Sequence, residues 1–188
     1  MKVISVYGSS QPQPGQPAYR LAYNLGRELA QAGFAVATGG YIGAMTAVSQ
    51  GAADVGGHVI GVTCDEIQAW RPVRPNRWIT QEIRYPTLEE RVAHLVTQND
   101  GVIALPGGVG TLAEVALTWS QLQVNVMPPR PFILLGEQWR RTLDAFIDPA
   151  YVLERHRALL QFAGSPAEAL EQLLVWGLES HARWMNRD

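Results

Sequence analysis

The chain has 188 residues, which is enough for about one domain with a hydrophobic core of its own. Its formal net charge at pH 7 is −2 and only 17% of its residues are charged, so charge favours neither nucleic acid nor an anionic membrane as a partner. The single cysteine, Cys64, excludes an intramolecular disulfide, and the four scattered histidines form no metal-binding motif. No apolar run is long enough to span a membrane and no signal peptide is recognisable, so the expected location is the cytoplasm.

Lysine is almost absent from the sequence. Of the fifteen basic residues, Lys2 is the one lysine and all the others are arginines. A Walker A loop needs a Gly-Lys pair, and the chain has none, so P-loop nucleotide hydrolases are excluded. A pyridoxal-phosphate enzyme needs a lysine for its Schiff base. Lys2 opens the first predicted strand and is badly placed for that role.

Apolar segments of strand length alternate along the chain with helical patterns. The predicted strands cover residues 3–7, 34–38, 58–63, 78–85, 101–105 and 131–135. The predicted helices cover residues 19–32, 43–55, 87–98, 111–123, 139–147, 151–162 and 166–185. Residues 65–75 contain two prolines and are predicted to be irregular.

This alternation predicts an α/β fold with a doubly wound, mostly parallel, Rossmann-like sheet and helices on both faces. The strands read as nearly continuous apolar segments, which is typical of a sheet that is covered on both sides. No internal repeat or linker divides the chain, so we expect a single nucleotide-binding domain over residues 1–188.

In such sheets ligands bind beyond the carboxyl ends of the strands. Three predicted strand ends carry glycine or small polar residues: Ser9 and Ser10; Gly39, Gly40 and Gly43; and Gly107, Gly108, Gly110 and Thr111. Glycines allow close backbone approach, and the N–H groups at the start of a helix bind anions. Each loop alone is explained by an ordinary tight turn, but the three together favour a phosphate-bearing ligand. The first two loops do not fit GxGxxG, so a dinucleotide cofactor is disfavoured.

Glu114 lies three residues after Thr111, and this spacing has two interpretations. As [ST]-x-x-[DE], Thr111 and Glu114 form a capping box, which is a purely structural device. Alternatively, Glu114 is a carboxylate one turn from a bound phosphate and faces the ligand. One conformer cannot do both, because a capping glutamate bends back to the backbone.

Arg91 belongs to the predicted helix 87–98 and lies beside its apolar stripe. One interpretation is a solvated arginine whose aliphatic stem covers the core. The other is a buried arginine that faces Glu114 and holds that carboxylate ionised and oriented.

These residues resemble those of a known family. Residues 106–114 read PGGVGTLAE, which resembles the PGGxGTxxE motif of the LONELY GUY (LOG) family. Residues 88–91 resemble its Met-x-x-Arg segment, 56–62 its GGxVIGV strand and 118–121 its TWxQ stretch. The two loops that begin at Gly8 and Gly39 are also similar, and the resemblance extends from residue 1 to about residue 136.

The resemblance implies a Rossmann-like homodimer that hydrolyses the N-glycosidic bond of AMP or N6-substituted AMP, of the cytokinin riboside 5′-monophosphate type. The products would be the free base and ribose 5-phosphate, and no metal or cofactor is used. Glu114 and Arg91 match the family's catalytic pair, and residues 106–111 match its phosphate-binding loop. The family was long labelled lysine decarboxylase, an activity that the single lysine argues against.

Four segments depart from the family pattern. Val92 follows Arg91 where the family has lysine, residues 38–40 lack the third glycine of the second loop, and residues 43–46 replace Gly-Leu-Met-Gly. The proline-rich residues 65–75 also differ from the cytokinin type. These departures affect the expected specificity for the N6 substituent more than they affect the expected fold. They leave two alternatives: a non-catalytic carrier similar to the molybdenum-cofactor carrier proteins, and a nucleotide sensor or scaffold.

Overall fold

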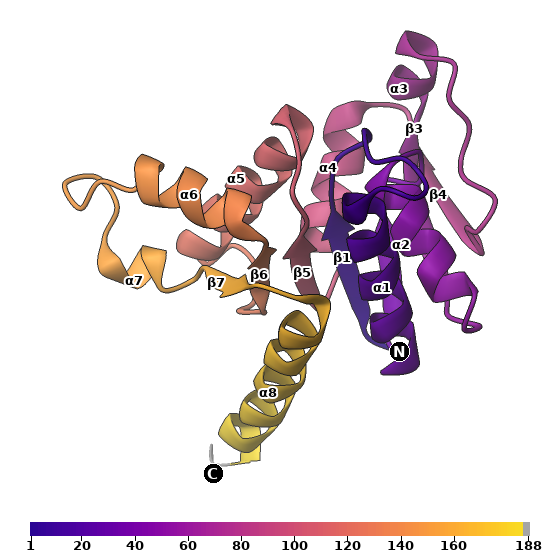
Figure 1. Cartoon of the computed structure of the whole chain (residues 1–188). Helices are drawn as coiled ribbons and strands as arrows, with labels where there is room; N and C mark the ends of the chain where they lie inside the picture. The colour runs from indigo at the N-terminus through magenta and orange to yellow at the C-terminus, as the bar shows by residue number, and fades with distance from the viewer. Residues whose placement is uncertain (186–188) are drawn as a thin grey trace.

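The computed structural model describes the backbone of residues 1–185 and the side chains of residues 1–177. In this part of the chain one sheet has seven strands, all parallel, in the order β4-β3-β2-β1-β5-β6-β7 (Figure 1). The strands are β1 Val3–Tyr7, β2 Ala35–Thr38, β3 Val59–Cys64, β4 Gln81–Tyr85, β5 Gly101–Ala104, β6 Phe132–Leu135 and β7 Gln161–Ala163. Strand order reverses at β1, which pairs with β2 on one side and β5 on the other. Such a switch point is where open α/β sheets bind ligands.

Helices cover both faces of this sheet. They are α1 Pro17–Gln31, α2 Ala44–Ala53, α3 Asp65–Trp70, α4 Leu88–Thr97, α5 Val109–Gln123, α6 Glu137–Phe146, α7 Glu154–Arg157 and α8 Pro166–Met185. Helices α1, α2 and α8 share one hydrophobic core with the strands, while α4, α5 and α6 share the other. The prediction of a doubly wound, Rossmann-like α/β fold is therefore confirmed.

Alternation along the strands assigns side chains to the two cores. In β1, Ile4 and Val6 point toward α1 and α2, whereas Tyr7 belongs to the core with α4 and α5. The α4 helix begins with a capping box, in which the Thr87 hydroxyl accepts from the Glu90 N–H and the Glu90 carboxylate accepts from the Thr87 N–H. This box fixes the start of the helix that carries Arg91.

Two sequence-based predictions of secondary structure are wrong. Residues 65–75 were expected to be irregular, but Asp65–Trp70 form α3, with Asp65 and Glu66 in its first turn where carboxylates stabilise the helix dipole. Residues 151–162 were expected to be helical, but only Glu154–Arg157 are, and Gln161–Ala163 form the edge strand β7. Three residues carry too little periodicity to predict a strand, and pairing with β6 decides the outcome. Within the described residues, none of the helices is long and apolar enough to cross a membrane.

Candidate functional site

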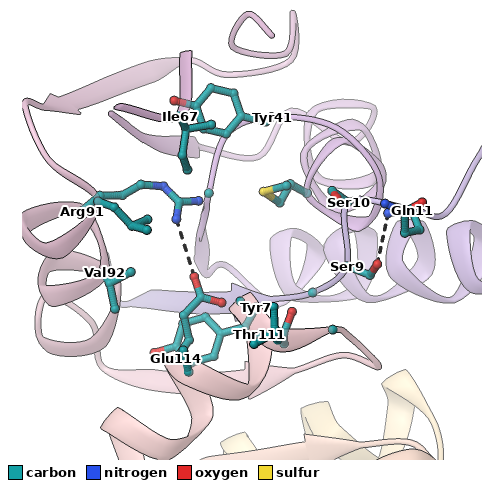
Figure 2. A pocket seen from close by; sticks show the side chains of 18 of the residues that line it. Tyr7, Ser9, Ser10, Gln11, Tyr41, Ile67, Arg91, Val92, Thr111 and Glu114 are labelled. Carbon is teal, nitrogen blue, oxygen red and sulfur yellow. Dashed lines mark hydrogen bonds and ion pairs between the residues drawn. The ribbon is translucent and has the colours of Figure 1, made fainter. Parts of the chain in front are cut away.

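A cavity of about 460 Å³ lies at the carboxyl ends of β1, β2 and β5 (Figure 2). Its lining comes from the end of β1, from the loops after β1 and β2, from α2, α3 and α4, and from the first turns of α5. The volume is within the range of small-ligand sites. The cavity occupies the switch point of the sheet, where the sequence predicted a ligand.

Eight of the eleven predicted site residues line this cavity: Ser9, Ser10, Gly39, Arg91, Gly108, Gly110, Thr111 and Glu114. Among the described residues, the remaining three, Gly40, Gly43 and Gly107, lie behind the lining and shape it. Gly43 has φ of +73°, and a Cβ there would strike the backbone of Ser9 and Ser10. Gly107 packs directly on the side chain of Thr111. These glycines are needed for close packing between loops.

Glu114 points into the cavity from α5 (Figure 2). The helix begins at Val109 with Gly108 as its N-cap, so Thr111 lies inside the first turn and cannot act as the N-cap. The capping-box interpretation of Thr111 and Glu114 is therefore wrong. Glu114 is 8% exposed, and its carboxylate is directed at the guanidinium of Arg91.

Arg91 reaches the same cavity from α4 and is only 6% exposed, so the interpretation of a solvated arginine is wrong. Its Nε–H donates to the Val62 carbonyl at 2.9 Å, and its Nη1 lies 3.8 Å from Glu114 Oε1. The guanidinium also lies 5.8 Å from the centre of the Tyr41 ring. The structure thus brings Arg91 and Glu114 together as a buried ion pair that is not closed by a short hydrogen bond.

Gly39 gives the Arg91 side chain its space. A Cβ at this position would collide with Arg91 Nη2 and crowd the Met45 sulfur. The sequence predicted Gly39 as a phosphate-binding residue, and the structure places it against the arginine of the ion pair. Any side chain at position 39 would displace the guanidinium from the carboxylate.

Burial decides the protonation of Glu114. Removal from water raises the pKa of this carboxyl from 4.5 to about 7, and the positive charge of Arg91 opposes that rise. Arg91 therefore acts in the direction that the sequence predicted, but burial is the larger effect. Near neutral pH the carboxyl is present in both its neutral and its ionised forms.

Sequence reasoning missed the side of the cavity that α3 and its neighbours form. Tyr41, Ile67, Trp70 and Arg71 all line it. The Tyr41 hydroxyl donates to the carbonyl of Cys64 and accepts from its N–H, which fixes the ring beside Arg91. Tyr41 follows the Gly39-Gly40 pair, so its place in a glycine loop was an available signal. The α3 residues offered none, because they lie in a short segment without periodicity.

Comparison with known proteins assigns the family. Residues 45–173 match the protein family described as "Possible lysine decarboxylase". The chain is 32% identical over 155 residues to the cytokinin riboside 5′-monophosphate phosphoribohydrolase of Rhodococcoides fascians, covering 80% of this chain and 76% of that protein. It is 34% identical over 183 residues to a probable enzyme of the same name from Oryza sativa subsp. japonica, covering 88% and 80%. The chain belongs to the LOG family.

A solved structure of the same fold is a cofactor-binding protein. The LOG-family chain superimposes on the molybdenum cofactor binding protein of Rippkaea orientalis with a TM-score of 0.70 and 28% identity. The superposition covers 90% of this chain and 93% of that protein. Because one fold serves both an enzyme and a cofactor-binding protein, function has to be argued from the site.

The description "lysine decarboxylase" does not fit this LOG-family chain. Lys2 is the only lysine in the sequence, and it lies exposed just before β1, at the end of the sheet opposite the cavity. Its amino group lies near Gly177 of α8. No lysine side chain can reach the cavity to form a Schiff base.

Proposed function

We propose that this protein hydrolyses the N-glycosidic bond of AMP or an N6-substituted AMP and releases the free base and ribose 5-phosphate. The observation that carries the proposal is the buried pair of Glu114 and Arg91, which faces a cavity of about 460 Å³ beside the start of α5. The sequence similarity to phosphoribohydrolases supports the same reaction.

The start of α5 is suited to the phosphate group. Its N-cap is Gly108, no side chain caps the first turn, and a Cβ at Gly108 or Gly110 would meet open space. The free N–H groups of a first helical turn, together with the helix dipole, attract an anion. The Thr111 hydroxyl faces the same space. Phosphate binding here would anchor the nucleotide while the chemistry proceeds at Glu114.

Glu114 is suited to the bond-breaking step in its ionised form. Hydrolysis joins the water oxygen to C1′ and breaks the bond from C1′ to the base, whose electron pair leaves with the base. Positive charge develops near C1′ on the way. The carboxylate can stabilise that charge, or it can accept a proton from the attacking water while the departing base takes up a proton. Arg91 keeps the carboxylate oriented.

The pH dependence separates these roles from general acid catalysis. Both roles of Glu114 need the ionised carboxylate, so the rate should rise as pH increases through about 7, the pKa of this carboxyl. A general acid would be needed in its protonated form, and the rate would then fall through the same pH. Measuring kcat from pH 5 to pH 9 distinguishes the two.

The direct test is incubation of AMP, and separately N6-isopentenyl-AMP, with the purified protein and chromatography for free base. Glu114→Gln serves as the matched control, because it keeps the shape of the side chain and removes its charge. Base release by the wild type alone supports the proposal. No release from either nucleotide by the wild type contradicts it.

A second candidate is a carrier that binds a phosphate-bearing pterin without turnover. The structural similarity to the molybdenum cofactor binding protein of Rippkaea orientalis favours it. This candidate predicts that a pterin remains bound through anaerobic purification and that no base is released from AMP. Purification without any bound pterin would count against it. A nucleotide sensor would instead bind AMP in calorimetry without releasing adenine.

We also propose that the protein is a homodimer. Along α5 and at its C-cap, four apolar side chains are left uncovered: Val109, Leu112, Leu117 and Val124 are between 36% and 84% exposed. An apolar helix face of this kind favours a protein contact, and a second copy of the chain would cover it. Sedimentation should show a dimer that Leu112→Glu converts to monomer. A monomeric wild type at micromolar concentration would contradict the proposal.

A further inference from the structure

Tyr7 connects the two helices that carry the ion pair. It is the last residue of β1, and it is buried at the switch point of the sheet with 2% of its surface exposed. Its hydroxyl donates to the Leu95 carbonyl of α4 at 3.2 Å and lies 3.0 Å from the Thr118 hydroxyl of α5. Leu95 follows Arg91 by one helical turn, and Thr118 follows Glu114 by one turn.

The contacts continue to Glu114 itself. The Thr118 hydroxyl lies 2.8 Å from the Glu114 carbonyl, to which it can donate. The Thr118 hydroxyl has one proton, so it donates either to this carbonyl or to Tyr7. When it donates to Tyr7, the tyrosine accepts from α5 and donates to α4 at the same time. Burial raises the pKa of the Tyr7 hydroxyl far above its usual value, so it stays neutral and keeps its proton for this link.

No direct hydrogen bond fixes the distance between the Arg91 guanidinium and the Glu114 carboxylate. At 3.8 Å, the Arg91 and Glu114 atoms are too far apart for a hydrogen bond that would hold them together. Arg91 is anchored through its Nε–H to the Val62 carbonyl. Because Val62 belongs to β3, the guanidinium is held against the sheet. The distance between the charges therefore depends on where α5 carries Glu114 relative to β3 and to α4, from which Arg91 extends.

We propose that Tyr7 is a positioning residue whose hydroxyl, by linking α4 to α5, fixes the distance between the Arg91 guanidinium and the Glu114 carboxylate. Its consequence for catalysis rests on the proposed function, but its geometric role does not. The positive charge of Arg91 on α4 lowers the pKa of the Glu114 carboxyl, and the negative charge of Glu114 in turn raises the pKa of the Tyr7 hydroxyl. Because the effect of the Arg91 charge weakens with distance, the pKa of Glu114 reports how far the guanidinium lies from the carboxylate.

Tyr7→Phe is a clean test of the link. Without the hydroxyl, the Leu95 carbonyl still accepts from the Asn99 amide at 2.9 Å, and Thr118 can still donate to the Glu114 carbonyl. No buried polar group loses its last partner, so the variant should fold. The helices should move apart, which weakens the effect of Arg91 on the carboxylate.

The expected result is a rise in the pKa of Glu114. An added separation of about 1 Å, at an effective dielectric constant of about 20, corresponds to roughly half a pH unit or slightly more. The measurement is a ¹³C-carboxyl NMR titration of protein labelled at glutamate. Glu114→Gln identifies the resonance by its disappearance. Unchanged titration of Glu114 in Tyr7→Phe would overturn the proposal.

Two further variants separate positioning from general loosening. Thr118→Val breaks the other end of the link, so it should raise the Glu114 pKa as well, and the double variant should add little to the larger single effect. Tyr19→Phe is the matched control, because this buried tyrosine donates to Gln50 between α1 and α2 on the other face of the sheet. An equal shift in Tyr19→Phe would also overturn the proposal.

Activity gives a second readout. If the wild type hydrolyses AMP, Tyr7→Phe should lower kcat/KM. It should also move the rising limb of the kcat/KM profile, which reports the free enzyme, to higher pH by the shift that NMR measures. If the wild type hydrolyses no nucleotide, the proposed function fails, but the NMR titration still tests the link. The two failures are therefore distinguishable.

Discussion

The two ends of α4 each hold a partly or fully buried arginine, and the two arginines are bonded differently. Beyond the last turn, Arg130 Nη1 donates to the carbonyls of Thr97 and Asn99 and to the Asn99 side chain. Near the first turns, the Arg91 Nε–H donates to the Val62 carbonyl, and Arg91 Nη1 lies 3.8 Å from Glu114 Oε1. Arg130 thus donates to backbone carbonyls at the end of α4, where carbonyls lack partners within the helix. Arg91 keeps donors directed at the cavity, as a ligand-binding site requires.

The largest expected effect is on activity at the first end of α4. Arg91→Met keeps the aliphatic stem but removes the charge that orients Glu114, so AMP hydrolysis should fall by about 10²- to 10³-fold. Steady-state release of adenine measures the loss. Activity within threefold of wild type would show that Arg91 is only a packing residue and would remove the difference between the two arginines.

The next effect is on stability and tests the burial of Glu114. Because its pKa is raised from 4.5 to about 7 in the folded protein, the folded state binds an extra proton between these values. The contribution of Glu114 to the unfolding free energy therefore falls as pH rises from 4.5 to 7, by a total of about 3 kcal/mol.

Glu114→Gln removes that pH dependence. The unfolding free energy of this variant, relative to wild type, should increase by up to about 3 kcal/mol between pH 4.5 and pH 8. Urea unfolding at three pH values measures it. Parallel pH dependences in the two proteins would mean that the carboxyl titrates normally in the folded state.

The other end of α4 should respond in stability alone. Arg130→Met leaves the carbonyls of Thr97 and Asn99 without the guanidinium and should cost about 2 kcal/mol of unfolding free energy. AMP hydrolysis should stay at the wild-type level wherever the variant is folded. A loss of activity comparable to that of Arg91→Met, in a folded variant, would contradict the comparison.

The smallest effect concerns the space beside Arg91. Gly39→Ala places a methyl group against the guanidinium and should lower kcat about tenfold, because a displacement of about 1 Å misorients the ion pair. Gly164→Ala is the control, since a Cβ there would lie 3.4 Å from a flexible Glu168 carboxylate oxygen. Equal activities in both variants would mean that Arg91 moves aside without consequence.

Most of the sheet could be predicted from the sequence because its strands are buried on both sides and read as apolar segments. The exceptions are instructive. The β7 strand has three residues and exists because β6 offers backbone partners, and α3 has six residues and no apolar stripe. Neither leaves a periodic signal long enough to recognise.

The sequence allowed the two charged residues of the site to be predicted, but not the residues that position them. The PGGxGTxxE pattern and the upstream arginine indicated Glu114 and Arg91, and the fold brings them together. Spacing alone also fitted a capping box at Thr111, which the earlier start of α5 excludes. Gly39 and Tyr7 act through atoms far away in the sequence, such as Arg91 Nη2 and the Leu95 carbonyl, so no local pattern reveals them.

The position of Lys2 has a practical consequence. It carries the only side-chain amine in the sequence and is exposed at the end of the sheet opposite the cavity. Amine-reactive dyes should therefore label this end and leave the cavity, whose lining contains arginine but no lysine, untouched. A sensor chip coupled through Lys2 would hold the molecules in a nearly uniform orientation, with the cavity directed toward the solution and open to ligands.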